Sequence, residues 1–147
     1  MPDNRIIRGD LDRIYDDPNA TCHLICSYIL SKGELKTNIG FFDHMLNLFA
    51  AHGRFDLVLD CDGDIEVDGH HSVEDIGIAL GQAVKEALGD KKGITRYASF
   101  YLPMDETLAL VALDISGRPF LVYDGTEMAP MIGNYDTELT EEFLRAF

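Results

Sequence analysis

The sequence predicts an α+β fold in which strand patterns and helix patterns alternate along 147 residues. Apolar residues recur at every second position in some segments and at three- or four-residue spacing in others, which separates strands from helices. The order of strands followed by a helix also starts again after Gly93, as in a duplicated unit. We therefore expect a tandem repeat, with a first unit over residues 1–92 and an incomplete second unit over residues 93–147.

The composition is that of an acidic globular chain. Lysine and arginine number 12 against 26 aspartates and glutamates, so the formal net charge is −14, and 46% of the residues are hydrophobic. Such a surface repels phosphate backbones, so we expect no nucleic-acid partner, and the apolar runs are too short to cross a membrane. The N-terminus lacks a secretory pattern and the cysteines are scattered, so we expect a cytoplasmic protein.

The first unit is expected to begin with a hairpin. Residues 11–15 and 21–30 favour strands, and the Asp16–Asn19 cluster between them favours a turn. A helix follows over residues 41–51, with an apolar stripe that Gly53 closes, formed by Phe42, Met45, Leu46 and Phe49. Strict alternation then predicts a strand over residues 55–62, and a short strand over 65–67.

A second helix is predicted from Ser72, whose hydroxyl would cap it, to Gly89. Its apolar stripe contains Val73, Ile76, Leu80, Val84 and Leu88. Gly77 and Gly81 lie within this helix at a spacing that favours close packing against another element rather than phosphate binding.

Residues after Gly93 predict strands over 97–102, 108–115 and 120–123, and then a helix over 136–147 with Thr137 or Thr140 as its cap. Aligning residues 42–49 of the first unit with residues 140–147 of the second places Glu142 opposite His44. Glu142 is therefore a candidate for any site that uses His44.

The start of the second helix carries the strongest chemical pattern. On a helix, Glu74 lies one turn from both His70 and His71, and this set of nitrogen and oxygen ligands suits a divalent metal such as manganese, iron or zinc. Adjacent histidines diverge, so the two rings could serve two metals, and Asp68 and Asp75 could orient the rings. The alternative is a solvated helix start in which the acidic groups complement the helix dipole.

Other candidates are single residues. His44 and His52 lie near the two ends of the first helix, and His44 becomes a ligand candidate if it lies near His70. Arg96 and Arg118 adjoin turn residues, and their planar donor groups suit a phosphate, although a solvated arginine paired with a nearby acid is an equal alternative.

Several motifs together resemble the imidazoleglycerol-phosphate dehydratase family of histidine biosynthesis: Gly40–Leu46, Gly69–Ala83, Arg96-Tyr97, Pro103–Glu106, Asp114–Pro119 and Asp136–Leu139. The resemblance implies a metal-dependent lyase that converts imidazole glycerol phosphate to imidazole acetol phosphate. It also implies a duplicated fold, each half a four-stranded sheet backed by two helices as in domain 2 of ribosomal protein S5. A homo-oligomer, a 24-mer in the family, and two Mn²⁺ ions per site held by paired His-His-x-x-Glu motifs are further implications.

The resemblance assigns roles to individual residues. Metal positions fall on His44, His70, His71 and Glu74, with Glu142 as a possible extra ligand from the alignment of the two units. Arg96 and Arg118 fall on phosphate-binding positions. We further expect catalytic roles for His44, His71 and Glu74, and substrate contacts for His44 and His52.

Two departures from the family pattern bear on activity. Ala20-Thr21 stands where the family usually has Glu-Thr, whose acid contacts substrate, and the sequence given reaches Phe147 without a second His-His-x-x-Glu motif. The sequence therefore leaves two hypotheses: a lyase, or a catalytically inactive metal-binding or scaffold relative of the same fold. We expect little turnover from these 147 residues alone.

Overall fold

The computed structural model describes residues 7–10, 21–26, 35–125 and 128–147. A four-stranded sheet forms one side of the molecule, with strand order β1 (Ile7–Asp10), β2 (Thr21–Cys26), β4 (Val58–Asp62), β3 (Leu35–Lys36). The pairs β1–β2 and β2–β4 are antiparallel, whereas β3 runs parallel to β4. The predicted strand over 11–15 and its turn lie outside the described residues, and β1 and β3 were not anticipated.

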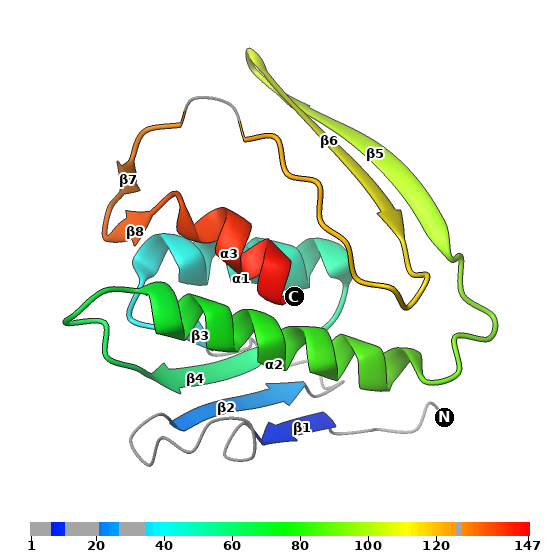
Figure 1. Ribbon diagram of the computed structural model, residues 1–147, viewed down its shortest axis with the longest axis horizontal. Coiled ribbons are helices and arrows are strands. Elements are labelled where there is room, and N and C mark those ends of the chain that lie inside the picture. Colours follow the sequence, from blue (N-terminus) through cyan, green and yellow to red (C-terminus); the bar gives the residue numbers. More distant parts are fainter. Residues whose placement is uncertain (1–6, 11–20, 27–34, 126–127) are drawn as a thin grey trace.

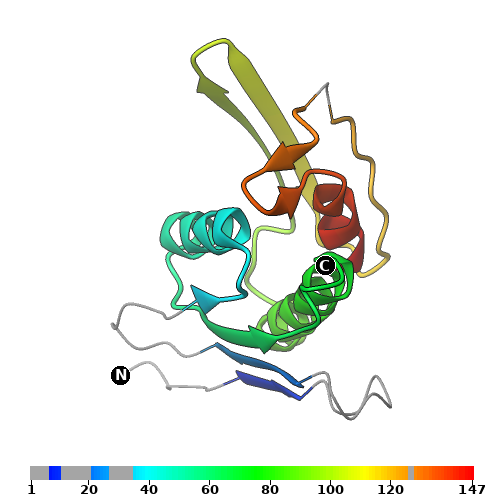
Figure 2. The ribbon, with the colours of Figure 1, turned by 90° about the vertical axis from the view of Figure 1, so that its left-hand side faces the viewer.

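In the described part of the chain, three helices stack above this sheet. The helices α1 (Gly40–Gly53) and α2 (His70–Leu88) cover one face of the sheet (Figure 1), and α3 (Leu139–Ala146) packs on α2 on the side away from it (Figure 2). These layers establish an α+β fold. No helix of the described residues is long and apolar enough to cross a membrane.

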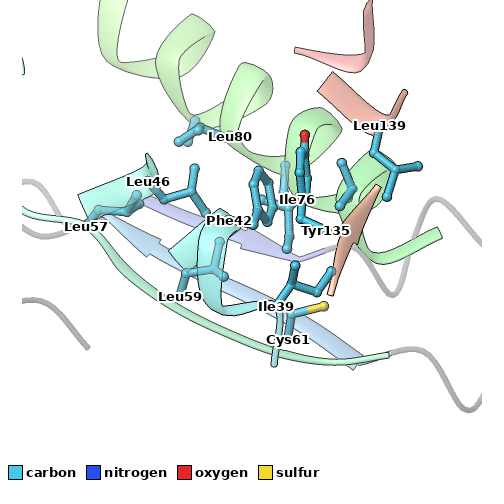
Figure 3. Close-up of a cluster of buried hydrophobic side chains, with 13 residues drawn as sticks. Ile39, Phe42, Leu46, Leu57, Leu59, Cys61, Ile76, Leu80, Tyr135 and Leu139 are labelled. Carbon is cyan, nitrogen blue, oxygen red and sulfur yellow. The ribbon is translucent and has the colours of Figure 1, made fainter. Parts of the chain in front are cut away.

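The core lies between the sheet and the helices (Figure 3). Leu57, Leu59 and Cys61 are each at most 4% exposed, which confirms that the alternating residues of this segment share a buried face. Helix residues fill the space above them, including Phe42, Leu46, Val73, Ile76, Ala79, Leu80 and Ala83.

The predicted stripe of the first helix is only half buried. Phe42 and Leu46 lie in the core, whereas Met45 and Phe49 are 44% and 42% exposed. The helix ends at Gly53, as expected, and Arg54 then adopts a left-handed backbone with φ of 57°. The residue whose left-handed backbone ends α1 is therefore Arg54 and not Gly53.

The second helix begins two residues earlier than predicted, because Gly69 and not Ser72 is its N-terminal cap. Ser72 lies inside the first turn at 2% exposure, and within the described part of the chain its hydroxyl oxygen has no hydrogen-bond partner. The capping prediction for Ser72 is wrong because its side chain faces the core. The predicted strand over 65–67 is also wrong, since these residues form a turn in which Val67 N–H donates to the Asp64 carbonyl at 2.8 Å.

The second half of the chain forms smaller sheets. Strands β5 (Tyr97–Met104) and β6 (Thr107–Asp114) make a hairpin that projects from the body of the molecule (Figures 1 and 2), as the pattern predicted. The predicted strand over 120–123 is wrong, because these residues have no ladder partner and are irregular. Strands β7 (Met131–Ile132) and β8 (Tyr135–Asp136) form a short unpredicted hairpin around Gly133, which has φ of 62°.

Neither threonine proposed as a cap performs that function in α3. The Thr137 hydroxyl donates to the carbonyls of Ala129 and Pro130, and the Thr140 hydroxyl pairs with the Tyr135 hydroxyl at 3.0 Å. The helix starts at Leu139 without a side-chain cap. The described residues after Gly93 thus form two separate two-stranded sheets and one helix, and the tandem repeat stays a prediction.

Candidate functional site

The first turns of the three helices meet at one end of the molecule. A Cβ on Gly69, the cap of α2, would lie 3.0 Å from Ile39 Cδ1 and 3.3 Å from Leu139 Cδ1. Ile39 caps α1 and Leu139 opens α3, and all three helices run in the same direction (Figure 1). His44, the His70 motif and Glu142 therefore belong to segments that begin at the same end.

The two adjacent histidines open α2 with their rings turned apart. The ring centroids of His70 and His71 are 6.3 Å apart and the ring planes meet at 89°. Both residues are exposed, and Glu74 one turn later is half-buried. The divergence expected for adjacent histidines is thus present, and it suits two separate ligand positions better than one.

Carboxylates surround this helix start in a way that the sequence predicted only in part. Asp68 accepts a hydrogen bond from the backbone N–H of His70 at 2.9 Å, and among the described residues it has no hydrogen bond to either imidazole ring. Asp64, which spacing did not single out, reaches His71, with 3.4 Å between Asp64 Oδ2 and His71 Nδ1. Helical spacing does not indicate this contact, because Asp64 precedes His71 by seven residues across a turn.

The side chains of Glu74, His71 and Asp64 also affect the Asp75 carboxyl. Partial burial raises the pKa of the Asp75 carboxyl, the neighbouring Glu74 carboxylate raises it further, His71 lowers it and Asp64 raises it. His71 thus lies among carboxylates from the turn and from the helix. A divalent cation placed there would relieve the repulsion among those acids.

The donor types at this end fit a first-row divalent metal, because exposed imidazoles and carboxylates are its usual protein ligands. The described residues of one chain do not, however, bring three or more His, Cys, Asp or Glu side chains into a group that could hold a metal ion. The expected convergence of His44, His70, His71 and Glu74 is thus not achieved within a single chain. A metal ion bound by these residues would need further donors from outside the described part of one chain.

The remaining helix candidates occupy separate positions. His44 is exposed in the first half of α1, and its neighbour Asp43 accepts a hydrogen bond from Thr37 N–H at 3.0 Å. His52 is exposed in the last turn of α1, at the opposite end of that helix. Glu142 is half-buried in α3.

The two arginines lie at the base of the β5–β6 hairpin. Arg96 pairs with Asp114 through two hydrogen bonds, of 2.7 Å from Nε and 3.1 Å from the guanidinium NH₂. The hydrogen bond from Arg96 holds the pKa of the Asp114 carboxyl below its usual value, and the charge of Arg118 adds to this lowering. Arg118 thus lies near the same acid, but in the described part of the chain it has no ion pair within 4.0 Å.

The arginines and the histidines are at opposite ends of one chain. The hairpin begins beside the C-terminal end of α2, whereas His70 and His71 open that helix (Figure 1). The helix has 19 residues and is therefore about 28 Å long. The described residues of one chain therefore do not bring the two groups into one site.

Comparison with known proteins identifies a matching family and several similar proteins. The family model described as imidazoleglycerol-phosphate dehydratase matches residues 37–147. The imidazoleglycerol-phosphate dehydratase of Acetivibrio thermocellus is 61% identical over 115 residues, which make up 78% of this chain and 59% of that protein. That of Streptococcus thermophilus is 61% identical over 113 residues, or 77% of this chain and 58% of that protein. The chain spans about three fifths of the length of these curated relatives.

Two solved structures with the same family name are also similar to this chain. A crystal structure of imidazoleglycerol-phosphate dehydratase from Staphylococcus aureus has a TM-score of 0.80 and 39% identity, and the match covers 97% of this chain and 76% of that one. The enzyme from Pyrococcus furiosus has a TM-score of 0.70 and 36% identity, over 85% of this chain and 67% of that one. Ala20, where the family pattern has an acid, lies outside both the family-model match and the described residues.

Proposed function

Because the chain belongs to the imidazoleglycerol-phosphate dehydratase family, we propose that it serves as a hydro-lyase subunit in histidine biosynthesis. The substrate is imidazole glycerol phosphate, and the products are water and imidazole acetol phosphate. The observation that carries this proposal is the intact start of α2, where His70, His71 and Glu74 lie within one helical turn inside the matched region. The setting is the cytoplasm.

Two manganese ions per site would be held by His44, His70, His71 and Glu74 together with donors from another copy. When bound, manganese would withdraw electron density from the imidazole of the substrate, which eases loss of a carbon-bound hydrogen that no carbonyl activates. The exposure of His70 and His71 leaves both rings accessible for this role. Glu142, at the same end, is a candidate for an additional carboxylate ligand.

The phosphate of the substrate would bind at the base of the β5–β6 hairpin. Arg118 is the more available of the two arginines, because Arg96 is already engaged by Asp114. A guanidinium donates two parallel hydrogen bonds to phosphate and so fixes its orientation. We therefore expect Arg118→Ala to raise KM more than Arg96→Ala does.

The separation of the arginines from the histidines supports a homo-oligomer in which one copy supplies metal ligands and another supplies the phosphate site. We assign the tandem-repeat arrangement, with units over 1–92 and 93–147, to the same proposal. The α+β layers and the match to solved family members support it.

The test is manganese binding followed by turnover. His71→Ala and Glu74→Ala should each lower the manganese bound per chain, measured by elemental analysis after dialysis, whereas Glu86→Ala on the exposed far end of α2 should not. Unchanged stoichiometry in both ligand variants contradicts the metal assignment. If the wild-type chain binds manganese but does not dehydrate the phosphorylated substrate, the inactive metal-binding alternative describes these residues.

A further inference from the structure

We propose that Asp64 is a positioning residue for His71, holding Nδ1 of the imidazole so that Nε2 is the atom presented to a metal ion. This inference rests on the proposed function, in which His71 is a metal ligand. The contact that carries it is the 3.4 Å approach of Asp64 Oδ2 to His71 Nδ1. Histidine ligands of metals commonly donate their other ring N–H to a carboxylate, which fixes the tautomer and the orientation of the ring.

The turn that carries Asp64 is seated against the first turn of α2. A Cβ on Gly63 would lie 3.3 Å from Ser72 Cβ and still closer to Ser72 Oγ, so the backbone before Asp64 approaches the helix where a side chain does not fit. The Asp64 carbonyl also accepts the Val67 N–H at 2.8 Å, which closes the turn. These two constraints place the Asp64 side chain beside the ring of His71.

The other nearby acids are less suited to this task. Asp68 is engaged by the backbone N–H of His70 at 2.9 Å. Glu74 is itself a proposed ligand, and Asp75 interacts with His71 through its charge but has no hydrogen bond to the ring among the described residues. Asp64 is therefore the acid that contacts Nδ1.

The exposure of His71 and Asp64 indicates what their contact contributes. The side chains of His71 and Asp64 are 71% and 53% exposed, and pairs this exposed contribute little to folding stability. An exposed ring retains rotational freedom, which a bound metal would have to remove. The contact with Asp64 orders the ring before a metal ion binds. It therefore removes part of the entropic cost of binding and directs Nε2 outward.

The first arm of the test is the tautomer of His71 in the metal-free full chain. ¹⁵N-detected NMR at alkaline pH, where the imidazole is neutral, should show the proton on Nδ1 in the wild type and its redistribution toward Nε2 in Asp64→Ala. Asp64→Asn keeps an acceptor oxygen and should retain the wild-type tautomer. A wild-type ring protonated mainly on Nε2 overturns the proposal, whatever the metal does.

The second arm is the dissociation constant for Mn²⁺ itself, measured by titration calorimetry. Asp64→Ala should weaken binding about 10- to 100-fold, and Asp64→Asn should restore most of the affinity. Glu66→Ala removes an exposed acid from the same turn and controls for net charge. Equal weakening in Asp64→Ala and Glu66→Ala, or no weakening in either, overturns the positioning role. If the wild type binds no Mn²⁺, the proposed function fails, and the NMR arm alone decides the contact between Asp64 and His71.

Discussion

Phe143 and Gly77 are in direct contact across the interface between α3 and α2: the Phe143 carbonyl oxygen lies 2.9 Å from where a Cβ on Gly77 would stand. The same Cβ would lie 2.8 Å from Ala146 Cβ, and one on Gly81 would meet the backbone of Phe147. The backbone of α3 therefore rests on a strip of α2 that has no side chains. The N-terminal ends of α2 and α3 both lie at the histidine end, so this packing also sets how these two helix starts lie relative to one another.

Gly77→Ala should destabilise the chain by about 1–3 kcal/mol, because the added methyl group overpacks a backbone contact. The usual helix-propensity gain of alanine over glycine, about 1 kcal/mol, opposes this loss only in part. Gly40→Ala is the matched control, since a Cβ at Gly40 has no atom within 4 Å among those described. Urea unfolding of both variants measures the difference, and equal midpoints would show that α3 does not rest on Gly77 in solution.

Local sequence patterns predicted the strand and the helix whose buried residues recur at a regular spacing. The alternation that ends at Cys61 and the stripe through Val73, Ile76 and Leu80 both lie in the core, and the glycine spacing in α2 correctly indicated close packing. These features follow from short-range periodicity, which the sequence displays directly. The same signal could not show that Met45 and Phe49 are exposed, because that depends on which elements cover α1.

The predictions that proved wrong depended on tertiary contacts, which local sequence patterns do not show. The Ser72 hydroxyl is an ordinary cap by residue type, yet the chain buries it, and residues 120–123 have strand propensity but no strand beside them. At the candidate site, helical spacing pointed to His70, His71 and Glu74 as candidates, whereas the contact of Asp64 depends on a turn that folds back on the helix. Spacing also could not show that Arg96 and Arg118 flank the base of a hairpin near the far end of α2.

Leu46→Ala should cost about 2–5 kcal/mol in the free energy of unfolding, because it leaves a cavity between α1 and the sheet. Leu46 is 2% exposed, whereas Leu48 on the same helix is 38% exposed and provides the control. Leu48→Ala should change stability by less than about 1 kcal/mol. Chemical denaturation of the two variants compares them, and similar losses would mean that the exposed side of α1 is covered in solution.

Arg96→Ala should raise the pKa of the Asp114 carboxyl toward its usual value, because the guanidinium hydrogen bonds that hold it down are removed. A carboxyl with a lowered pKa in the folded chain adds stability above the unfolded pKa, and loses that contribution as the pH falls through the folded pKa. The contribution is small for so exposed a pair. NMR titration of Asp114 measures the shift, with Arg145→Ala, whose partner is Glu141, as the control. An unchanged Asp114 titration would show that the pair does not persist in solution.

Tyr135→Phe should reduce the loss of stability at alkaline pH. Tyr135 is 4% exposed, stacks on Phe42 with ring centroids 5.9 Å apart, and its hydroxyl pairs with that of Thr140 at 3.0 Å. Burial raises the pKa of the Tyr135 phenol, and the hydrogen bond with Thr140 lowers it by less. The folded chain therefore retains this proton above pH values near 10, about the pKa of an unfolded tyrosine, so stability falls as the pH rises from there toward the folded pKa.

Phenylalanine at position 135 keeps the stacked ring and removes the titrating group, so the slope of stability against pH above about 10 should become shallower. Near neutral pH the variant should lose about 1 kcal/mol through the missing hydrogen bond with Thr140. Tyr97→Phe is the control, because it also replaces a tyrosine by phenylalanine but at a side chain that is 73% exposed. Urea denaturation across the neutral to alkaline range provides both quantities. If Tyr135→Phe and Tyr97→Phe follow the same alkaline slope as the wild type, the phenol is not buried against Phe42 in solution, and the seating of β8 beside α1 is not as described.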